Sequence, residues 1–420
     1  MNPTDFNLYD VIVIGAGPAG SSTAFHCAKL GLKTLLIEKQ KPGRDKPCGG
    51  ALSDRCLPLL GKLALDAINC KVEELHVYSP DLKYFQYKKQ QGNFVLRKVF
   101  DEAMAYDAEN AGATLMTETK AFSLAQNRDN SYTVDISIKN CEFQKMTGRF
   151  IVLACGLQDN DLIKNIPDKN GNNTRSICPK NEKDYLAICM NSESKISNEL
   201  LTASPFYFQP KTLGIFFGAV PNGYGWCFTK DDSINVGVGC TASLLSTNNI
   251  KEAYDAFIRT LKTKKIIPGD LILTEGRAFP LPFKHTAKET VLGNVILVGD
   301  AAGFVSPVTG EGIYYSLKSG QLAALILSEH IKNGTSLDRY QKIWEKEFGN
   351  DLDKWGFNLR RFIYQKRTRM ELAVHLARAD ASTRKIVSEM IMGVIKYRET
   401  TRKGLLHLPL CLVKALFFKK

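Results

Sequence analysis

The first clear pattern in the chain is a short run of apolar, mostly β-branched residues from Tyr9 to Ile14. Such a run is typical of a buried parallel strand, because helices cover both faces of the strand. A glycine-rich segment follows at residues 15–20, and Ser21 to Leu30 predicts a helix. A second apolar run, Lys33 to Ile37, predicts the neighbouring strand. The chain therefore begins with a β-α-β unit.

Later apolar runs divide into two groups. The strands expected beside the first unit are Leu115–Leu124, Tyr132–Ile138, Phe150–Gly156 and Asn294–Val298. A second, mostly antiparallel sheet is expected to form the floor of a substrate chamber. Its strands would be Tyr185–Met190, Phe206–Phe208, Gly214–Val220, Tyr224–Thr229 and Ser233–Val238.

Helical patterns separate and follow these strands. Lys251–Lys264 and Tyr314–Ile331 predict helices, and the pattern from Ser336 to the end is helical. Residues 159–181, rich in Asn, Lys and Asp, indicate a loop. The expected fold class is α/β with three parts. These are a discontinuous Rossmann-like domain (1–70, 95–157 and 278–335), an antiparallel substrate-binding domain (71–94 and 158–277) and a basic helical C-terminal module (336–420).

The glycines after the first strand indicate a pyrophosphate site. Glycine permits a tight turn and close backbone approach, and the following helix directs its N-terminal amides at phosphate. The residues expected to contact the dinucleotide here are Gly15, Ala16, Gly17, Ala19 and Gly20. Glu38 ends the second strand, 18 residues after Gly20, where an acidic ligand for the ribose is expected.

Segments farther along the chain indicate which dinucleotide is bound. Asp300 follows a buried strand and can accept a hydrogen bond from a ribityl hydroxyl. The positive end of the helix that opens near Gly310, Gly312 and Ile313 suits an electron-rich flavin ring. Because a nicotinamide dehydrogenase needs no such second segment, the expected cofactor is FAD.

Two more residues are expected to bind the same cofactor. Arg97 resembles the arginine at a helix start that reaches the FAD pyrophosphate in hydroxybenzoate-hydroxylase-like flavoproteins. Ala121 is expected to contact adenine through its backbone. The alternative is that Arg97 is a surface charge and Asp300 an ordinary helix cap.

Three further segments resemble the geranylgeranyl reductase family of FAD-dependent oxidoreductases. They are Lys46–Ser53, Pro221–Lys230 and Ser306–Ile313, and the resemblance extends from residue 10 to about residue 330. Members of this family hydrogenate isoprenoid double bonds. The family usually has proline after the phenylalanine of its Tyr-x-Trp-x-Phe element, where this chain has Thr229. The C-terminal module matches no motif of the family.

The resemblance implies roles for several side chains. Cys48, Gly49 and Ala51 would lie against the flavin, and Cys48 would donate a proton or gate access to the reacting bond. Tyr224 and Trp226 share one face of a strand and would line a prenyl tunnel, where their π-faces also favour a developing carbocation. Cys48, Tyr224 and Trp226 are therefore the expected catalytic residues. The alternative for all three is simple packing.

The C-terminal module carries most of the net charge. It contains 15 Lys/Arg and four Asp/Glu from Arg360 onward, a net +11 of the +13 of the whole chain. The apolar run 405–420, basic at its end, predicts an interfacial anchor on an anionic membrane surface rather than a nucleic-acid site. The alternative is a helix docked on the protein itself, with solvated lysines.

The composition of the chain indicates where in the cell the protein is expected. No stretch approaches the about 20 apolar residues of a membrane span, and no signal peptide is visible. Eleven cysteines without a CxxC pair favour a reducing compartment over disulfides, and no metal site is expected. The expected location is the cytoplasm, at the inner face of the membrane.

The sequence leaves the electron donor and the reaction type open. There is no second GxGxxG segment for a nicotinamide domain, so NAD(P)H would bind transiently, or a ferredoxin-like carrier would deliver electrons. A flavin monooxygenase or protein-modifying oxidase is the main alternative to a prenyl reductase. A flavoprotein with a binding or regulatory role at the membrane is a third possibility.

Overall fold

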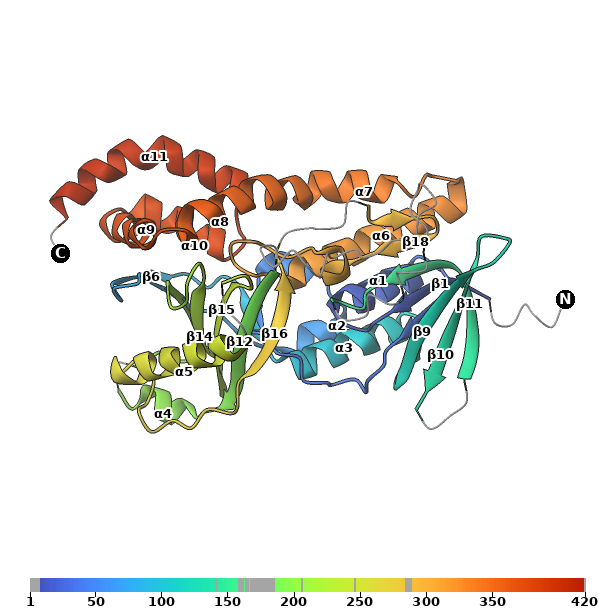
Figure 1. Cartoon of the computed structure of the whole chain (residues 1–420), viewed down its shortest axis with the longest axis horizontal. Coiled ribbons are helices and arrows are strands. Elements are labelled where there is room, and N and C mark those ends of the chain that lie inside the picture. Colours follow the sequence, from blue (N-terminus) through green and yellow to red (C-terminus); the bar gives the residue numbers. More distant parts are fainter. Residues whose placement is uncertain are drawn as a thin grey trace.

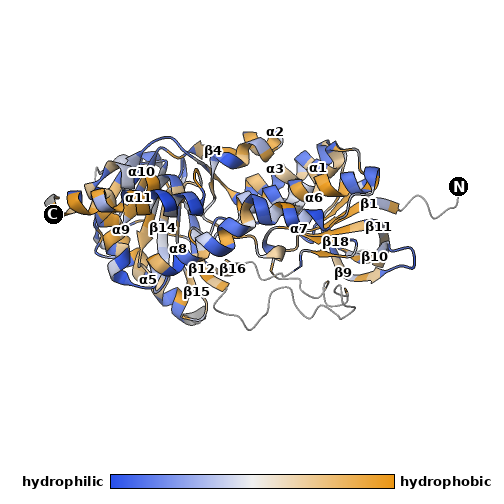
Figure 2. Ribbon diagram, turned by 90° about the horizontal axis from the view of Figure 1, so that it is seen from above, coloured by the Kyte–Doolittle hydropathy of each residue, from blue (hydrophilic) through white to orange (hydrophobic). Residues whose placement is uncertain are grey.

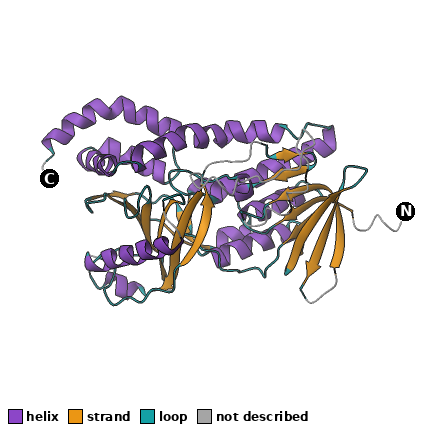
Figure 3. Cartoon of the chain, viewed as in Figure 1, coloured by secondary structure: helices purple, strands orange, loops and turns teal. Residues whose placement is uncertain are grey.

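The computed structural model describes residues 8–139, 143–157, 162, 166, 186–204, 207–244, 247–283 and 289–418. Two sheets lie toward opposite ends of the molecule, and the C-terminal helices extend along one side of both (Figure 1). Figure 3 separates the strands of the two sheets from the helices that cover them. The expected α/β fold class is confirmed. The loop expected at 159–181 lies, apart from Leu162 and Ile166, outside the described residues.

The first sheet has eight strands, six of them in the order β17-β18-β11-β1-β2-β8. β1 (Leu8–Ile14) pairs in parallel with β2 (Thr34–Ile37) and with β11 (Phe143–Leu153). The other strands are β8 (Thr114–Met116), β9 (Thr119–Gln126), β10 (Tyr132–Ile138), β17 (Val291–Leu292) and β18 (Val295–Leu297). The helices packed beside them are α1 (Pro18–Lys29), α3 (Arg97–Asn110) and α6 (Ile313–Asn333). The first strands and helices predicted from apolar patterning are thus confirmed.

One predicted strand is wrong, because Leu115–Leu124 is two strands. The chain turns at Glu118, whose φ is +50°, and the Thr119 hydroxyl bonds the carbonyl of Thr117 across the turn. β8 pairs with β2 before this turn, whereas β9 pairs with β10 after it. The apolar pattern runs through the turn because apolar residues lie on both sides of it, Leu115 and Met116 before it and Ala121 and Leu124 after it.

The second sheet has seven strands in the order β16-β12-β15-β14-β13-β5-β6. All its pairings are antiparallel except the one between β13 and β5. The strands are β5 (Glu74–Tyr78), β6 (Tyr84–Lys88), β12 (Leu186–Lys195), β13 (Thr212–Phe217), β14 (Tyr224–Thr229), β15 (Ser233–Thr241) and β16 (Arg277–Pro282). A three-stranded sheet of β3 (Ala51–Leu52), β7 (Asn93–Val95) and β4 (Ile68–Lys71) is separate.

One expectation for the second sheet needs correction. Phe206–Phe208 is not a strand where it is described, because Tyr207 and Phe208 lie in a loop. The buried ring of Phe208 instead lies 6.0 Å from that of Phe216, between centroids. The division into domains remains a proposal. Because β16 pairs with β12, that proposal is better drawn with residues 278–282 in the substrate-binding part.

Two short helices and one long helix accompany the sheets: α2 (Lys62–Asp66), α4 (Asn198–Thr202) and α5 (Thr247–Thr263). The C-terminal module is helical, as predicted. Its elements are α7 (Arg339–Trp344), the π-helical turns Glu345–Gly349 and Asp351–Gly356, α8 (Phe357–Tyr364), α9 (Arg367–Ala379), α10 (Ala381–Ile391) and α11 (Tyr397–Phe417).

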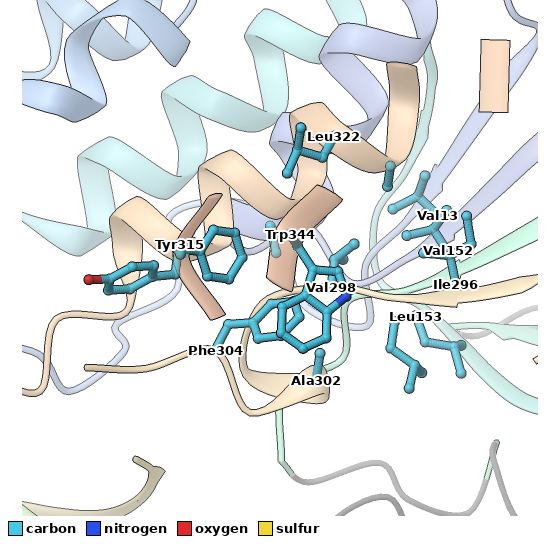
Figure 4. Close-up of a cluster of buried hydrophobic side chains, with 14 of the residues drawn as sticks. Val13, Val152, Leu153, Ile296, Val298, Ala302, Phe304, Tyr315, Leu322 and Trp344 are labelled. Atoms are coloured by element: carbon cyan, nitrogen blue, oxygen red, sulfur yellow. The ribbon is translucent and has the colours of Figure 1, made fainter. Parts of the chain in front are cut away.

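α7 packs the C-terminal module against the first sheet. The fully buried indole of Trp344 lies 4.6 Å from the ring of Phe304, between centroids, and donates a 2.8 Å hydrogen bond to the hydroxyl of Thr290. Figure 4 shows both rings beside Val298, close to the strand residues Val152 and Ile296. The C-terminal module therefore shares one core with the first sheet.

α11 is held to its neighbours through polar contacts. Asp380, fully buried before α10, accepts hydrogen bonds from His407 Nε2 at 2.8 Å and Lys414 Nζ at 2.6 Å. The Cys411 thiol, between these two positions, is also buried. The exposed apolar residues of α11 are Leu405, Leu406, Leu408, Leu410, Leu412, Val413 and Leu416. α11 thus combines a docked side with many exposed apolar side chains. Figure 2 colours the ribbon by hydropathy, and hydrophobic residues appear in orange on this helix.

None of the helices in the described part of the chain is long and apolar enough to cross a membrane.

Candidate functional site

The glycine turn after β1 is built for close approach of another group. Gly15 has a φ of +102°, and a Cβ there would lie 2.5 Å from the carbonyl oxygen of Ala154. A Cβ on Gly20 would lie 1.7 Å from the carbonyl oxygen of Gly15. Neither position can take a side chain without moving the backbone, so the turn stays tight and α1 begins directly behind it.

Glu38 lies at the end of β2, next to this turn. Its carboxylate is 6% exposed and accepts the backbone N–H of Ala16 at 2.9 Å and that of Gln40 at 3.0 Å. The side chain is therefore fixed by backbone donors on both oxygens. It lies in the wall of a cavity, as expected for a group that meets a ribose.

This first cavity measures about 340 Å³ and extends from the glycine turn to the start of α6. Most residues predicted to bind the cofactor line it. They are Gly15, Gly17, Ala19, Glu38, Cys48, Arg97, Ala121, Asp300, Gly310, Gly312 and Ile313. The structure thus brings together residues that lie far apart in the sequence, within 15–48, 97–121 and 300–313.

Four predicted residues lie elsewhere. Ala16 and Gly20 are behind the cavity wall, where Ala16 donates to Glu38 and Gly20 packs on Gly15. Gly49 and Ala51 line a second cavity instead. Their expected contact with the cofactor stays a prediction.

Arg97 and Asp300 supply charge to the first cavity. Arg97 is 8% exposed and forms a two-pronged ion pair with Asp101, with N–O distances of 2.7 and 2.6 Å. Burial, the largest single effect, lowers the pKa of Arg97, but the charges and hydrogen bonds of Asp101 and Cys48 together outweigh it, and the pKa is raised. Asp300 has Lys46 Nζ at 3.7 Å from Oδ2. Arg97 is therefore a buried, paired charge rather than a surface charge, and its contact with the cofactor stays a prediction.

The residues around the first cavity fit FAD. The tight turn and helix N-terminus suit a pyrophosphate, the fixed carboxylate of Glu38 suits a ribose, and Ala121 lies in the wall where a base would fit. Asp300 and the start of α6 lie at the other end, where a ribityl chain and a ring would fit.

A second cavity of about 190 Å³ adjoins the first. The residues that line both are Cys48, Phe279, Leu281, Gly310, Gly312 and Ile313. The rest of its lining is mainly apolar and comes chiefly from the second sheet, from residues 49–53, from residues 306–311 and from the C-terminal module. A molecule in this chamber would therefore meet the flavin end of the first cavity.

Tyr224 and Trp226 both line the chamber from β14, as predicted. The phenol of Tyr224 donates to the carbonyl of Thr309 at 2.5 Å, and burial raises its pKa well above the usual value. The indole nitrogen of Trp226 donates to Asn235 Oδ1 at 2.7 Å. The two ring centroids are 5.9 Å apart. Both side chains are thus fixed, and the hydroxyl proton of Tyr224 is directed at a carbonyl.

Cys48 sits at the junction of the two cavities. Its Sγ accepts the backbone N–H of Gly50 at 3.4 Å, which leaves the thiol hydrogen free to point elsewhere. Gly50 has a φ of +72°, and a Cβ there would lie 2.1 Å from the carbonyl oxygen of Val95. A Cβ on Gly49 would lie 2.6 Å from the ring of Phe228. These glycines let the Cys48 loop pack closely against Val95 of β7 and Phe228 of β14.

A polar network under this loop was not predicted. Asn235 Nδ2 donates to the carbonyl of Cys48 at 3.0 Å and to Glu193 Oε2 at 2.9 Å. Glu193 also pairs with Lys230 Nζ at 2.6 Å, and Lys230 is fully buried. The one available signal was a polar residue, Asn235, within a predicted apolar strand.

Thr229 replaces the family's usual proline without disturbing β14. Its hydroxyl donates to the carbonyl of Gln209 at 2.5 Å and accepts the backbone N–H of Thr212 at 3.1 Å. Thr229 pairs with Ile234 across the sheet. The substitution therefore ties β14 to the start of β13.

Sequence reasoning also missed the contribution of the C-terminal module to the chamber. Arg360 and Tyr364 of α8, together with Ile391 and Met392 at the end of α10, line its wall. The Tyr364 hydroxyl donates to the carbonyl of Val308 at 2.9 Å. No motif marks these residues, because helix packing alone brings them to the site.

Comparisons with known proteins agree with this geometry. A family model for FAD dependent oxidoreductases matches residues 10–159, and one for the geranylgeranyl reductase catalytic domain matches residues 181–270. The chain is 30% identical over 351 residues to a chloroplastic geranylgeranyl diphosphate reductase of Arabidopsis thaliana, covering 80% of this chain and 71% of that protein. It is also 30% identical over 359 residues to a digeranylgeranylglycerophospholipid reductase of Methanococcus aeolicus, covering 81% and 83%.

Solved structures show the same fold. A geranylgeranyl bacteriochlorophyll reductase-like protein of Thermoplasma acidophilum superimposes with a TM-score of 0.77 at 22% identity, covering 97% of this chain and 98% of that one. A flavin-dependent brominase superimposes with a TM-score of 0.69 at 18% identity, covering 92% and 94%. At these identities the likeness concerns the fold alone.

Proposed function

Since the chain belongs to the geranylgeranyl reductase family of FAD-dependent oxidoreductases, we propose that it reduces isoprenoid double bonds in a prenyl lipid, diphosphate or quinone. The observation that carries the proposal is the apolar chamber next to the flavin end of the cofactor cavity, with six residues common to both. An extended hydrocarbon chain can enter such a chamber and present a double bond to the ring.

Bound FAD, once reduced, supplies hydride for the double bond. The residues of the first cavity bind and orient it in this proposal. The glycine turn holds the pyrophosphate with Arg97 close by, Glu38 accepts from the ribose, and Asp300 accepts from the ribityl chain. The N-terminal end of α6 lies near the ring.

Cys48 is the proposed proton donor, acting from Sγ. It lines both cavities, and the Gly50 amide orients its sulfur without consuming its hydrogen. Tyr224 also lies at the chamber wall, but its proton is directed at Thr309. We therefore assign Tyr224 to shaping the chamber.

Trp226 is proposed to hold the prenyl chain against the cofactor site. Its indole is fixed by Asn235, and the π-face can stabilise positive charge that develops as the double bond is protonated. The apolar lining excludes water, so the proton comes from the positioned thiol rather than from solvent.

The electron donor is proposed to be NAD(P)H bound transiently, or a ferredoxin-like carrier. Reduction of the holoenzyme by each donor, followed as loss of flavin absorbance under anaerobic conditions, separates the two.

We further propose that the protein works at the inner, cytoplasmic face of an anionic membrane, with α11 as its contact. The exposed leucines of this helix and the excess of basic residues in the module support the proposal. A substrate with a long hydrocarbon chain would then pass from the membrane to a chamber whose wall includes α8 and α10.

The reductase and the monooxygenase alternatives differ in their need for oxygen. A reductase adds hydrogen to a geranylgeranyl substrate when the flavin is reduced in the absence of air. A product that gains oxygen, and forms only in air, would instead establish monooxygenation. A holoenzyme that binds the substrate and changes it under neither condition would favour the binding or regulatory role.

A further inference from the structure

The chamber is lined by only two charged side chains among the described residues, Glu311 and Arg360. Glu311 is neutralised locally, because Arg55 forms an ion pair with Oε2 and the Ser53 hydroxyl donates to Oε1 at 2.6 Å. The guanidinium of Arg55 also stacks 3.9 Å from the ring centroid of Tyr314. This carboxylate therefore adds no net charge to the chamber.

Arg360 has no comparable neutralising partner. In the described part of the chain no carboxylate lies within ion-pair distance of it. Its Nη2 donates to two neutral acceptors, the carbonyl of Asn222 at 3.3 Å and the hydroxyl of Thr241 at 2.5 Å. Its guanidinium carbon lies 4.3 Å from the ring centroid of Phe283. Arg360 is thus a positioned cation in a mainly apolar chamber.

Most of the donor capacity of Arg360 is unused. A guanidinium has five N–H donors, and neither Nε nor Nη1 forms a hydrogen bond to a described residue. Burial lowers the pKa of Arg360 from its usual value, which is the electrostatic cost of desolvating an unpaired cation. An anion bound beside Arg360 would offset this desolvation cost. It would also accept hydrogen bonds from the N–H groups that have no partner.

We propose that Arg360 binds a phosphate group at the head of the prenyl substrate. The inference rests on the proposed function and narrows it. Of the three substrate classes named above, a prenyl diphosphate carries such a group and so does a prenyl lipid with a phosphate head group, whereas a quinone does not. The planar fork of arginine matches two phosphate oxygens at once, and the apolar remainder of the chamber takes the chain.

The test compares Arg360→Gln and Arg360→Lys with wild type on three substrates. These are geranylgeranyl diphosphate, a digeranylgeranylglyceryl phospholipid and geranylgeraniol, which has the same chain without phosphate. Arg361→Gln is the matched control, because it removes one positive charge from the neighbouring, exposed position of α8. FAD content and thermal midpoint are measured for each holoenzyme.

Arg360→Gln is expected to raise KM for the phosphorylated substrate that the wild type uses by roughly 10- to 100-fold. The KM for geranylgeraniol, the kcat for each substrate and the FAD content are expected to stay close to the wild-type values. Arg360→Lys should fall between, because it keeps the charge and loses the fork. Arg361→Gln should behave as wild type. Which phosphorylated substrate is affected distinguishes a diphosphate from a phospholipid head group.

Two results would overturn the phosphate site while leaving the reductase intact. One is an equal loss on geranylgeraniol and on the phosphorylated substrates, and the other is no change of KM on either. Failure of the wild type to reduce any of the three substrates would instead count against the proposed function itself. Direct binding of geranylgeranyl diphosphate to the oxidised holoenzyme, measured by calorimetry, should weaken in Arg360→Gln even then if the phosphate site is correct.

Discussion

The side-chain amide of Asn235 donates a 3.0 Å hydrogen bond to the backbone carbonyl of Cys48, 187 residues earlier in the chain. The same side chain accepts the indole N–H of Trp226 at 2.7 Å. One amide therefore links the loop that carries the proposed proton donor to the ring that faces the proposed substrate, and Asn191 Nδ2 donates a second, 3.3 Å hydrogen bond to the same carbonyl of Cys48. The position of either group depends on β15.

Replacing Asn235 with Leu should uncouple these two groups. The indole N–H of Trp226 would lose its buried partner, at a cost of about 1–3 kcal/mol. The carbonyl of Cys48 would keep only the longer, 3.3 Å hydrogen bond from Asn191 Nδ2. We expect a lower free energy of unfolding in urea, together with a fall in kcat and an altered flavin absorbance spectrum.

Ser233→Ala is the matched control for Asn235→Leu. Ser233 lies on the same strand and donates to Glu193 at 2.8 Å, but it does not contact Cys48. Stability in this variant should fall slightly, with an unchanged flavin spectrum. If Asn235→Leu lowered stability and left kcat and the spectrum at wild-type values, the proposed positioning role would be wrong.

Asp300→Ala should yield colourless apoprotein. The variant removes the carboxylate proposed to bind the ribityl chain and leaves Lys46, 3.7 Å away, without its partner in the cavity. FAD content is measured from absorbance after purification. Asp351→Ala, whose carboxylate holds the start of α11 outside both cavities, controls for loss of an acidic group. An Asp300→Ala protein that is fully loaded with FAD would contradict the assigned cofactor site.

The membrane proposal predicts that deleting Gly404–Lys420 abolishes sedimentation with anionic liposomes. A double variant, Leu406→Glu with Leu416→Glu, should have nearly the same effect, because both side chains are at least 75% exposed and their loss disturbs no packing. Leu65→Glu, an exposed position far from α11, is the control. Unchanged binding after the deletion would move the membrane contact to another surface.

Local pattern was enough to predict the cofactor side of the site. The strand, the glycine turn and Glu38 lie within 30 residues, so their order in the sequence already reflects their order in space. Asp300 could also be predicted as a cofactor-binding residue, because a strand that ends in Gly-Asp is a local signal as well. The break within Leu115–Leu124 was missed because apolar periodicity does not register a turn at a residue such as Glu118.

The substrate side depended on tertiary packing and was predicted only in part. Tyr224 and Trp226 were found through a motif, whereas Arg360 and Tyr364 reach the chamber from a helix more than 100 residues later. Nothing near Arg360 in the sequence indicates that it lacks a carboxylate partner. Such a feature exists only after the chain has folded.

The most direct test of whether this protein is a prenyl reductase is the mass of the product that dithionite-reduced holoenzyme forms from geranylgeranyl diphosphate in the absence of oxygen. Trp226→Ala, expected to retain its FAD, is the control for reduction without a functioning chamber. We expect the wild type to add hydrogen in pairs and Trp226→Ala to add far less. An unchanged substrate mass with the reduced, FAD-loaded wild type, for the diphosphate, the phospholipid and the alcohol alike, would contradict the proposal that this protein is a prenyl reductase.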